Sequence, residues 1–328
     1  MLRDEVLTIL KSAPGDLSGE EISRRLGVTR MAVSHAVKAL RAEGYVIESA
    51  TNRGYRMVSG ADRLTAGELY AHLPEARRET VRCFDEIDST NTYLKREAMN
   101  GAPHGLCAVA NAQTAGRGRS GRGFVSEPDC GVYLSMLLRP YCAPERAMTL
   151  TAHAAVAVCQ AIRNVTGASP AIKWTNDVLL NGRKVCGILT EITLEAETGL
   201  IDSVVIGVGV NVNNAPEDFP PELRGVAGSV FSETGEKTDR ARLAAALILA
   251  LDEVSAAWAA DSRACLEEYR ALCVTTGREV RVLRGDTVCH AFALGITDDF
   301  ALRVRYDDGS EEDLNAGEVS VRGLCGYE

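Results

Sequence analysis

The chain has 328 residues, of which 46% are hydrophobic and 25% are charged, and its net charge is −9. This composition is typical of a globular protein, and the length exceeds what one core usually holds, so we expect two or three domains. The absence of a run of about 18 apolar residues and of a secretory pattern at the start predicts a cytoplasmic protein with no membrane partner.

The cysteines and the charge distribution narrow the choice of partners. Ten cysteines are scattered without a CxxC pair and the five histidines do not cluster with them, so no metal site is predicted. Residues 1–60 carry nine Lys/Arg and seven Asp/Glu, a net charge of +2, which leaves −11 on the remainder. Any contact with nucleic acid is therefore expected in the first sixty residues.

Those sixty residues predict a helical unit followed by a small hairpin. Ser18 and Glu21 form a capping box, and Thr29 can cap a following helix. Apolar side chains repeat at helical spacing at Val33, Ala36, Val37 and Leu40. Strands are expected at 45–48 and 54–58 around Thr51 and Asn52, with a linker at 59–62. This order is typical of a winged helix-turn-helix.

The outward face of the second helix and the hairpin carries polar and basic side chains. The candidate DNA contacts are Arg30, Ser34, His35, Lys38 and Arg53. The alternative is a helical docking module with a solvated basic face, and the modest charge leaves both interpretations open.

An unusual glycine and arginine segment follows at residues 113–124. Glycines at 116, 118, 121 and 123 alternate with arginines at 117, 119 and 122. Glycine lets the backbone approach a ligand closely, and arginine suits carboxylate and phosphate. The segment predicts a loop that closes around an anion. The alternative is a disordered tract that binds nucleic acid without specificity, but the apolar surroundings favour the loop.

Strands and helices are expected around this loop. Residues 87–91 cap a helix that reaches 100–101, and strands are expected at 105–113 and 131–138. An apolar helix follows at 149–165. The hydroxyls and amide at Ser89, Thr90 and Asn91 could face a ligand, or they could serve as a plain helix cap.

The segment 173–191 predicts a hairpin. Asn181 and Gly182 between apolar runs are a strong turn signal, and alternation then puts Lys184, Cys186 and Ile188 on one face. Gly187 offers bare backbone. A lysine just past a turn is often solvated, but this one lies in a strand that otherwise belongs to the core.

The remainder predicts one more long strand and a separate small domain. The strand spans 201–212, and its glycines are no dinucleotide fingerprint because no helix follows. A long loop at 213–238 favours a lid or an interface. Helices at 240–260 and 262–273 precede short strands at 278–322, with turns at 284–286, 298–299 and 308–309, which predict a small antiparallel barrel.

Five motifs, in order, resemble the bifunctional biotin–protein ligase and biotin-operon repressor family over essentially the whole chain. They lie at 88–91, 113–122, 173–177, 183–191 and 207–211. The resemblance implies an α+β multidomain fold. Its units are a winged helix-turn-helix domain (1–60), a central mixed-sheet ligase domain of the class II aminoacyl-synthetase-like, biotin–lipoate type (64–273) and a small antiparallel β-barrel (274–328).

The resemblance also implies an activity. Biotin and ATP with Mg²⁺ would form biotinyl-5′-adenylate and pyrophosphate, and the biotinyl group would pass to a lysine of a biotin carboxyl carrier protein. The adenylate would also favour a homodimer through the central sheet, which binds operator DNA upstream of biotin genes and represses them. The carrier and the second subunit would compete for one surface.

Site residues are carried over by motif. Catalytic roles are implied for Lys184, Arg117, Arg119 and Asp177. Biotin binding is implied for Ser89, Thr90, Asn91, Gln113, Gly116, Arg117, Gly118, Arg119, Lys184 and Gly187. Nucleotide binding is implied for Arg119, Arg122, Lys173, Asn176, Lys184 and Asn211.

Three positions depart from the usual family pattern, and three other functions remain as alternatives. Thr175 stands where proline is common, Phe124 where tryptophan is frequent, and Thr190 where valine is frequent. The alternatives are a lipoate–protein ligase, a ligase whose winged helix does not bind DNA, and a ligand-sensing transcription factor without ligase activity. The loop and the winged helix favour biotin over lipoate.

Overall fold

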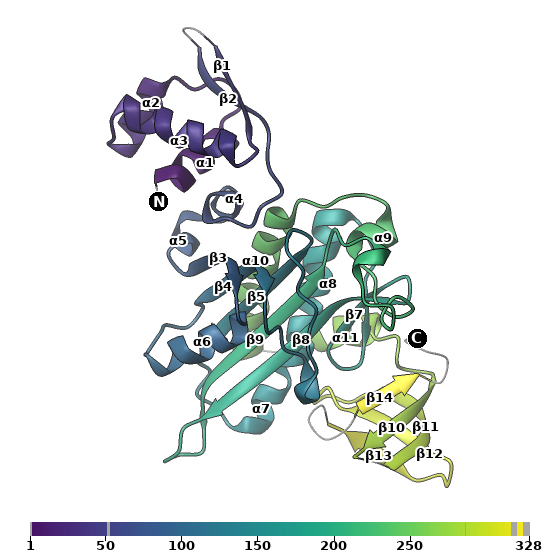
Figure 1. Cartoon of the computed structure of the whole chain (residues 1–328). Helices are drawn as coiled ribbons and strands as arrows, with labels where there is room; N and C mark the ends of the chain where they lie inside the picture. Colours follow the sequence, from purple (N-terminus) through teal and green to yellow (C-terminus); the bar gives the residue numbers. More distant parts are fainter. Residues whose placement is uncertain (1, 51–52, 261, 286, 316–319, 324–328) are drawn as a thin grey trace.

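The computed structural model describes residues 2–50, 53–260, 262–285, 287–315 and 320–323. Along the chain it forms a helical head with a two-stranded hairpin, a central α/β body and a small β-sheet. Figure 1 shows the head and the small sheet at opposite ends of the body.

The head is a winged helix-turn-helix, as expected. Its elements are α1 (Leu2–Ser12), α2 (Gly19–Leu26), α3 (Arg30–Ala42), β1 (Val46–Ala50) and β2 (Gly54–Ser59). The predicted caps are present, because the Ser18 hydroxyl accepts from the Glu21 amide and the Thr29 hydroxyl from the Ala32 amide. The apolar repeat of α3 is buried against α1 and α2. The hairpin turn expected at Thr51 and Asn52 lies outside the described residues.

The head rests on the first short helix of the body, α4 (Ala66–Tyr70), which is followed by α5 (Glu75–Arg78). The Thr8 hydroxyl donates to the Gly67 carbonyl at 3.2 Å, and Lys11 pairs with the buried Glu68. These contacts join α1 directly to α4.

The body is built on a seven-stranded mixed sheet in the order β3-β4-β5-β9-β8-β7-β6. Its strands are β3 (Val81–Ile87), β4 (Cys107–Gln113), β5 (Gly131–Leu138), β6 (Ala171–Lys173), β7 (Asp177–Leu180), β8 (Arg183–Leu194) and β9 (Ile201–Asn211). The pair β3–β4 is parallel and the other pairs are antiparallel.

Helices cover the two faces of this sheet unequally. The long helices α8 (Leu150–Thr166) and α10 (Arg240–Ala260) pack together on one face, where they form the main core. Helix α10 is long and apolar enough to cross a membrane, but here it packs on α8 and β5. On the opposite face, α6 (Thr90–Met99) packs against β4, β5 and β9 with a second, smaller core.

Shorter elements complete the body and connect it to the carboxyl-terminal sheet. They are α7 (Pro144–Met148), α9 (Val230–Thr234) and α11 (Arg263–Leu272). Helix α9 interrupts the segment 213–238, which the sequence predicts as an unbroken loop. The side chain of Ser229 caps α9 by accepting from the Ser232 amide.

The last domain is an antiparallel five-stranded sheet in the order β13-β12-β11-β10-β14. Its strands are β10 (Glu279–Arg284), β11 (Thr287–Ile296), β12 (Leu302–Tyr306), β13 (Glu311–Leu314) and β14 (Ser320–Gly323). Trp174 joins this sheet to the body, since its amide donates to the Thr275 hydroxyl and its indole to the Phe300 carbonyl. The turn predicted at 284–286 extends outside the described residues at 286.

One prediction about side-chain direction is wrong. The Asn181–Gly182 turn is present, with φ of 49° and 79°, but Cys186 does not share a face with Lys184. The pairing of Val178 with Cys186 and of Leu179 with Lys184 leaves Val185 as an extra residue, a β-bulge. The bulge turns both Val185 and Cys186 into the core, while Lys184 and Gly187 face the opposite side.

Candidate active site

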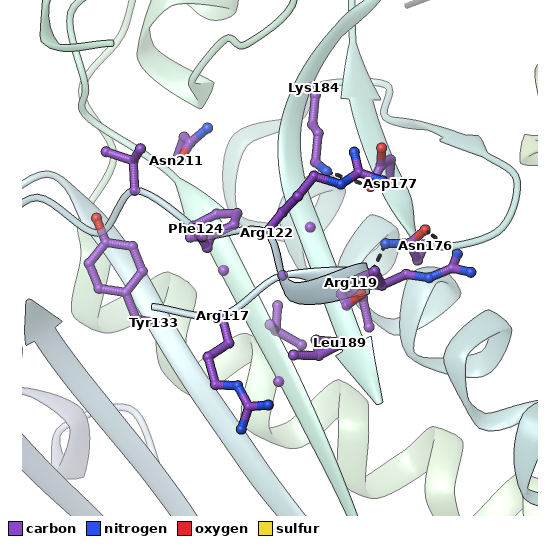
Figure 2. Close-up of a pocket in the computed structure, with 18 of the residues that line it drawn as sticks. Arg117, Arg119, Arg122, Phe124, Tyr133, Asn176, Asp177, Lys184, Leu189 and Asn211 are labelled. Carbon is purple, nitrogen blue, oxygen red and sulfur yellow. Dashed lines mark hydrogen bonds and ion pairs between the residues drawn. The ribbon is translucent and has the colours of Figure 1, made fainter. Parts of the chain in front are cut away.

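A cavity of about 560 Å³ lies on the open face of the sheet, beside the glycine and arginine loop (Figure 2). It brings together nearly every ligand-binding residue predicted from the sequence. Those that line it are Ser89, Thr90, Asn91, Gln113, Arg117, Gly118, Arg119, Arg122, Lys173, Asn176, Asp177, Lys184, Gly187 and Asn211. Gly116 does not line the cavity.

The floor of the cavity includes glycine backbone on two adjacent strands, β8 and β9. Gly187 pairs with Gly209, which pairs with Tyr133 on β5. A Cβ on Gly209 would lie 2.6 Å from the Phe124 ring, and one on Gly207 would lie 2.1 Å from Oδ1 of Asn91. Side chains at these two positions would therefore displace the residues packed above them.

One end of the cavity is polar and uncharged. The Gln113 carbonyl oxygen accepts from the Thr90 amide at 2.9 Å and from the Thr90 hydroxyl at 3.1 Å, and Nε2 of Gln113 donates to Ser126. Ser135 lies beneath and donates to the Thr90 hydroxyl at 2.7 Å. Ser89 caps α6, so the first turn of that helix presents its hydrogen-bonding groups to the cavity.

The opposite end is charged. Nζ of Lys184 lies 2.6 Å from Oδ1 of Asp177, and the Arg119 guanidinium donates to Oδ1 of Asn176 at 3.0 Å. Burial lowers the pKa of Arg119 from its ordinary value, while the charge of Asp177 acts in the opposite direction. Figure 2 shows Arg119 and Arg122 directed toward Asn176 and Asp177, whereas Arg117 extends the other way.

The glycine and arginine loop is closed by its own backbone. The Gly118 amide donates to the Arg122 carbonyl at 2.7 Å, and the Phe124 amide donates to the Gly116 carbonyl at 2.9 Å. Gly116 therefore closes the base of the loop from outside the cavity. This ordered arrangement matches the predicted anion loop better than a disordered tract.

The segment 213–238 covers the charged end, in agreement with a lid. Phe219, Leu223, Val226 and Ala227 line the cavity. The Lys184 amide donates to the Val226 carbonyl at 2.9 Å, and the Asn211 side chain donates to the Gly228 carbonyl at 3.0 Å. The cover is therefore tied to two of the predicted site residues.

Several cavity residues escaped sequence reasoning. Arg281 lines the cavity from β10 of the carboxyl-terminal sheet, and Tyr133 and Leu189 line it from the body. Arg281 is an isolated arginine in a strand of another domain, and nothing in its neighbouring sequence indicates that it reaches the cavity. The alternation of β8 could have indicated Leu189, because it lies two residues beyond Gly187.

The predicted DNA contacts are exposed on the head. Arg30, Ser34, His35 and Lys38 are exposed on α3, and Arg53 is exposed beside β2. Arg56 of the hairpin is paired with Glu48 at 2.7 Å. Within the described ranges, no group of three or more His, Cys, Asp or Glu side chains could hold a metal ion.

The two ends define the ligand by its chemistry. The uncharged end can hold a neutral ring through paired donors and acceptors, while the charged end gathers arginines and lysines for anions. A ligand with a neutral ring, an apolar middle and an anionic tail fits this order. The cationic end can also bring two anions together, because fixed positive charge offsets their repulsion.

Family models match three parts of the chain. The biotin/lipoate A/B protein ligase family matches residues 83–211, an HTH domain matches 3–56, and the biotin protein ligase C terminal domain matches 275–322. The matches fall within the three expected domains, whose boundaries stay predictions.

Curated relatives match over nearly their whole length. The bifunctional ligase/repressor BirA of Bacillus subtilis is 36% identical over 96% of this chain and 97% of its own, and that of Escherichia coli is 29% identical over 93% and 92%. A biotin protein ligase from Aquifex aeolicus, solved in complex with biotin and ATP, is 25% identical with a TM-score of 0.63 over 74% of this chain and 98% of its own.

Proposed function

This chain belongs to the bifunctional biotin–protein ligase and biotin-operon repressor family, and we propose that it joins biotin to a biotin carboxyl carrier protein and represses biotin genes. The ligase uses ATP to form biotinyl-5′-adenylate and then transfers the biotinyl group to one lysine of the carrier. The same adenylate acts as the corepressor for the DNA-binding head.

The observation that carries this proposal is the polarity of the cavity. Its uncharged end, around Thr90 and Gln113, suits the neutral ureido ring of biotin. Its charged end, around Lys184 and Arg119, suits the biotin carboxylate and the α-phosphate of ATP. Between these ends, the glycine backbone of the floor lets Phe124 and Asn91 pack close to the sheet.

In the first step, an oxygen of the biotin carboxylate attacks the α-phosphorus of ATP. The bond from that phosphorus to the bridging oxygen breaks, and pyrophosphate leaves. We assign Lys184 to the position between the two anions, with Arg117 and Arg119 supplying further positive charge. Magnesium arrives with ATP as part of the substrate.

In the second step, the neutral amine of the carrier lysine attacks the acyl carbon, the bond from that carbon to the phosphate oxygen breaks, AMP leaves and the nitrogen gives up a proton to solvent. The attacking amine must be neutral, and we assign Asp177 to orient it, since that carboxylate lies at the charged end of the cavity. The closed glycine and arginine loop protects the adenylate from water until the carrier arrives.

The nucleotide occupies the charged end of the cavity, beneath the lid formed by residues 213–238. We assign Arg122, Lys173, Asn176 and Asn211 to it, as the family motifs imply. We add Arg281, because this residue brings a positive charge into the cavity from the last domain. The triphosphate is the most highly charged part of ATP and is therefore the partner for Arg281.

Repression requires a second subunit and an operator. From Leu189 to Leu194, β8 pairs with β9 alone in the described part of the chain, so its other edge is open. Ile192 and Leu194 are 38% and 53% exposed on this strand. We propose that the adenylate-loaded protein uses this edge to bind the carrier and, when the carrier is scarce, to bind a second copy.

The dimer brings two α3 helices to two operator half-sites, with Arg30, Ser34, His35, Lys38 and Arg53 contacting the DNA. Both the DNA and the carrier are cytoplasmic, and we propose the same location for this protein.

A gel shift tests both halves of the proposal together. DNA upstream of the biotin genes of the host is incubated with the protein alone, with biotin, with ATP, and with both, and carrier labelling is measured in parallel. We expect a shift with biotin plus ATP only. A shift under every condition would contradict control by the adenylate.

Two rival outcomes have their own signatures. Labelling without any shift would identify a ligase whose head does not bind DNA. A ligand-dependent shift without labelling would identify a transcription factor that has lost the ligase reaction. We expect that lipoate, used in place of biotin, supports neither carrier labelling nor the DNA shift.

A further inference from the structure

One carboxylate beside the cavity is not used by the proposed chemistry. Glu191 lies on β8, two residues beyond Leu189 of the cavity wall, and its side chain is 16% exposed. Three groups from two other segments converge on it. The guanidinium of Arg117 lies 3.3 Å from Oε1, Nζ of Lys95 lies 3.0 Å from the same oxygen, and Asn91 donates to Oε2 at 2.9 Å.

The charge state of Glu191 is well defined. Burial acts to raise the pKa of this carboxyl group, but hydrogen bonds from Asn91 and Lys95 and the charge of Arg117 hold it below its usual range. Glu191 is therefore an anion at neutral pH.

Arg117 accordingly has two possible anionic partners. Its guanidinium lies on Glu191 and points away from the charged end of the cavity (Figure 2), yet Arg117 also lines the cavity. A ligand with a carboxylate in the cavity would compete with Glu191 for the same guanidinium. The pair with Glu191 must break before Arg117 can turn to the ligand.

We infer that Glu191 is a positioning residue that holds the Arg117 side chain away from the ligand until the biotin carboxylate displaces it. This inference rests on the proposed function, because it takes biotin as the competing anion. Lys95 shares Oε1 with Arg117 and therefore weakens the hold of Glu191 on that side chain.

The inference predicts opposite effects for two neutral substitutions. Glu191→Gln keeps an acceptor for Asn91 but removes the charge, so biotin should bind about two- to fivefold more tightly, the range of one partly exposed ion pair. Lys95→Gln removes the cation that shares Oε1 of Glu191 with Arg117, so biotin should bind about twofold more weakly. Binding is measured by calorimetry on the full-length protein without ATP.

The same variants are tested without any ligand. Trypsin cleaves after arginine, and cleavage after Arg117 reports how firmly its side chain is held. Glu191→Gln should speed this cleavage about two- to fivefold and Lys95→Gln should slow it. Asp202→Asn is the matched control, because Asp202 pairs with Arg139 rather than with the loop, and it should change neither measurement.

Two further measurements isolate the role of Arg117. In an Arg117→Gln background, adding Glu191→Gln should no longer change biotin affinity. Biotin methyl ester, which lacks the anionic carboxylate, should bind the wild type and Glu191→Gln equally. A merely structural role for Glu191 would instead weaken both ligands and lower the unfolding midpoint.

The outcomes separate this inference from the proposed function. Tighter biotin binding with faster cleavage in Glu191→Gln supports the inference, and unchanged cleavage or weaker binding in both variants overturns it. If no variant binds biotin while cleavage changes as expected, the hold on Arg117 stands and biotin is the wrong ligand.

Discussion

Arg119 lies between the loop and the charged end of the cavity, where its guanidinium bonds Asn176. If Arg119 closes the loop over the adenylate, the Arg119→Gly variant should release adenylate on the order of tenfold faster. This factor corresponds to the loss of one charge-assisted hydrogen bond. Released adenylate is measured by chromatography in the absence of the carrier. Release at the wild-type rate, with an unchanged unfolding midpoint, would remove this role from Arg119.

Arg281 provides a second test at the residue scale, since it enters the cavity from another domain. Arg281→Ala should raise the KM for ATP about three- to tenfold and leave the KM for biotin unchanged. The control is Arg303→Ala, because Arg303 on β12 is paired with Asp313. Equal effects on both substrates would indicate a general disturbance of the cavity rather than a phosphate contact.

Helix α8 carries a buried histidine that should make the fold sensitive to acid. Burial lowers the pKa of His153, while its hydrogen bond to the Thr149 carbonyl acts the other way. The ring also packs on Phe300, between the body and the last sheet. The unfolded chain therefore binds a proton more readily than the folded one, so stability is intact above pH of about 6.5 and falls as the pH drops below it.

The His153→Leu variant checks this sign. Its unfolding midpoint should fall less between pH 7.5 and pH 5.5 than that of the wild type, because leucine fills the site without binding a proton. An identical fall in the two proteins would assign the acid sensitivity to other groups.

The open edge of β8 is the element on which dimer formation should depend. Ile192→Lys places a charge on that edge and should prevent the biotin- and ATP-dependent dimer, because a charged side chain opposes strand pairing between subunits. Light scattering with both ligands measures the mass. Val288→Lys, a change at an exposed hydrophobic position on the last sheet, should leave the dimer intact.

At the scale of the whole molecule, one buried arginine joins the linker of the head to the body. Arg240 on α10 is fully buried, and its guanidinium donates to Oδ1 of Asp62 at 2.8 Å and to the Asp62 carbonyl at 2.7 Å. It also donates to Asn111 and to the Gly131 carbonyl, on the two strands that flank the glycine and arginine loop. This side chain links the DNA-binding head to the part of the sheet that bears the site.

Arg240→Met should therefore destabilise the protein by about 3 kcal/mol, since it removes the donor for the buried Gly131 carbonyl and for the partly buried oxygens of Asp62 and Asn111. Urea unfolding measures this loss. Arg242→Met is the control, because Arg242 is exposed on the same helix and should cost under about 0.5 kcal/mol. A small effect of Arg240→Met would mean that water replaces the guanidinium.

Local patterns were sufficient for much of the fold and most of the site. Thr29 and the repeat from Val33 to Leu40 specify α3, and Asn181 with Gly182 specifies the hairpin, because caps, turns and periodicity act within a few residues. The five motifs identified fourteen residues that line the cavity, since most of them lie at strand ends, at the start of α6 or in the glycine and arginine loop.

Tertiary structure alone decided the rest. The bulge at Val185 turned Cys186 into the core, because register depends on the partner strand β7. Gly116 closes the loop from outside the cavity, and Arg281 reaches the cavity from another domain. Glu191 contacts Arg117 because the alternation of β8 places it on the same side of the sheet as the cavity. The sequence by itself determined the elements and the chemistry available to the site. Contacts between distant segments decided which groups face each other, because such contacts depend on packing and register rather than on neighbours along the chain.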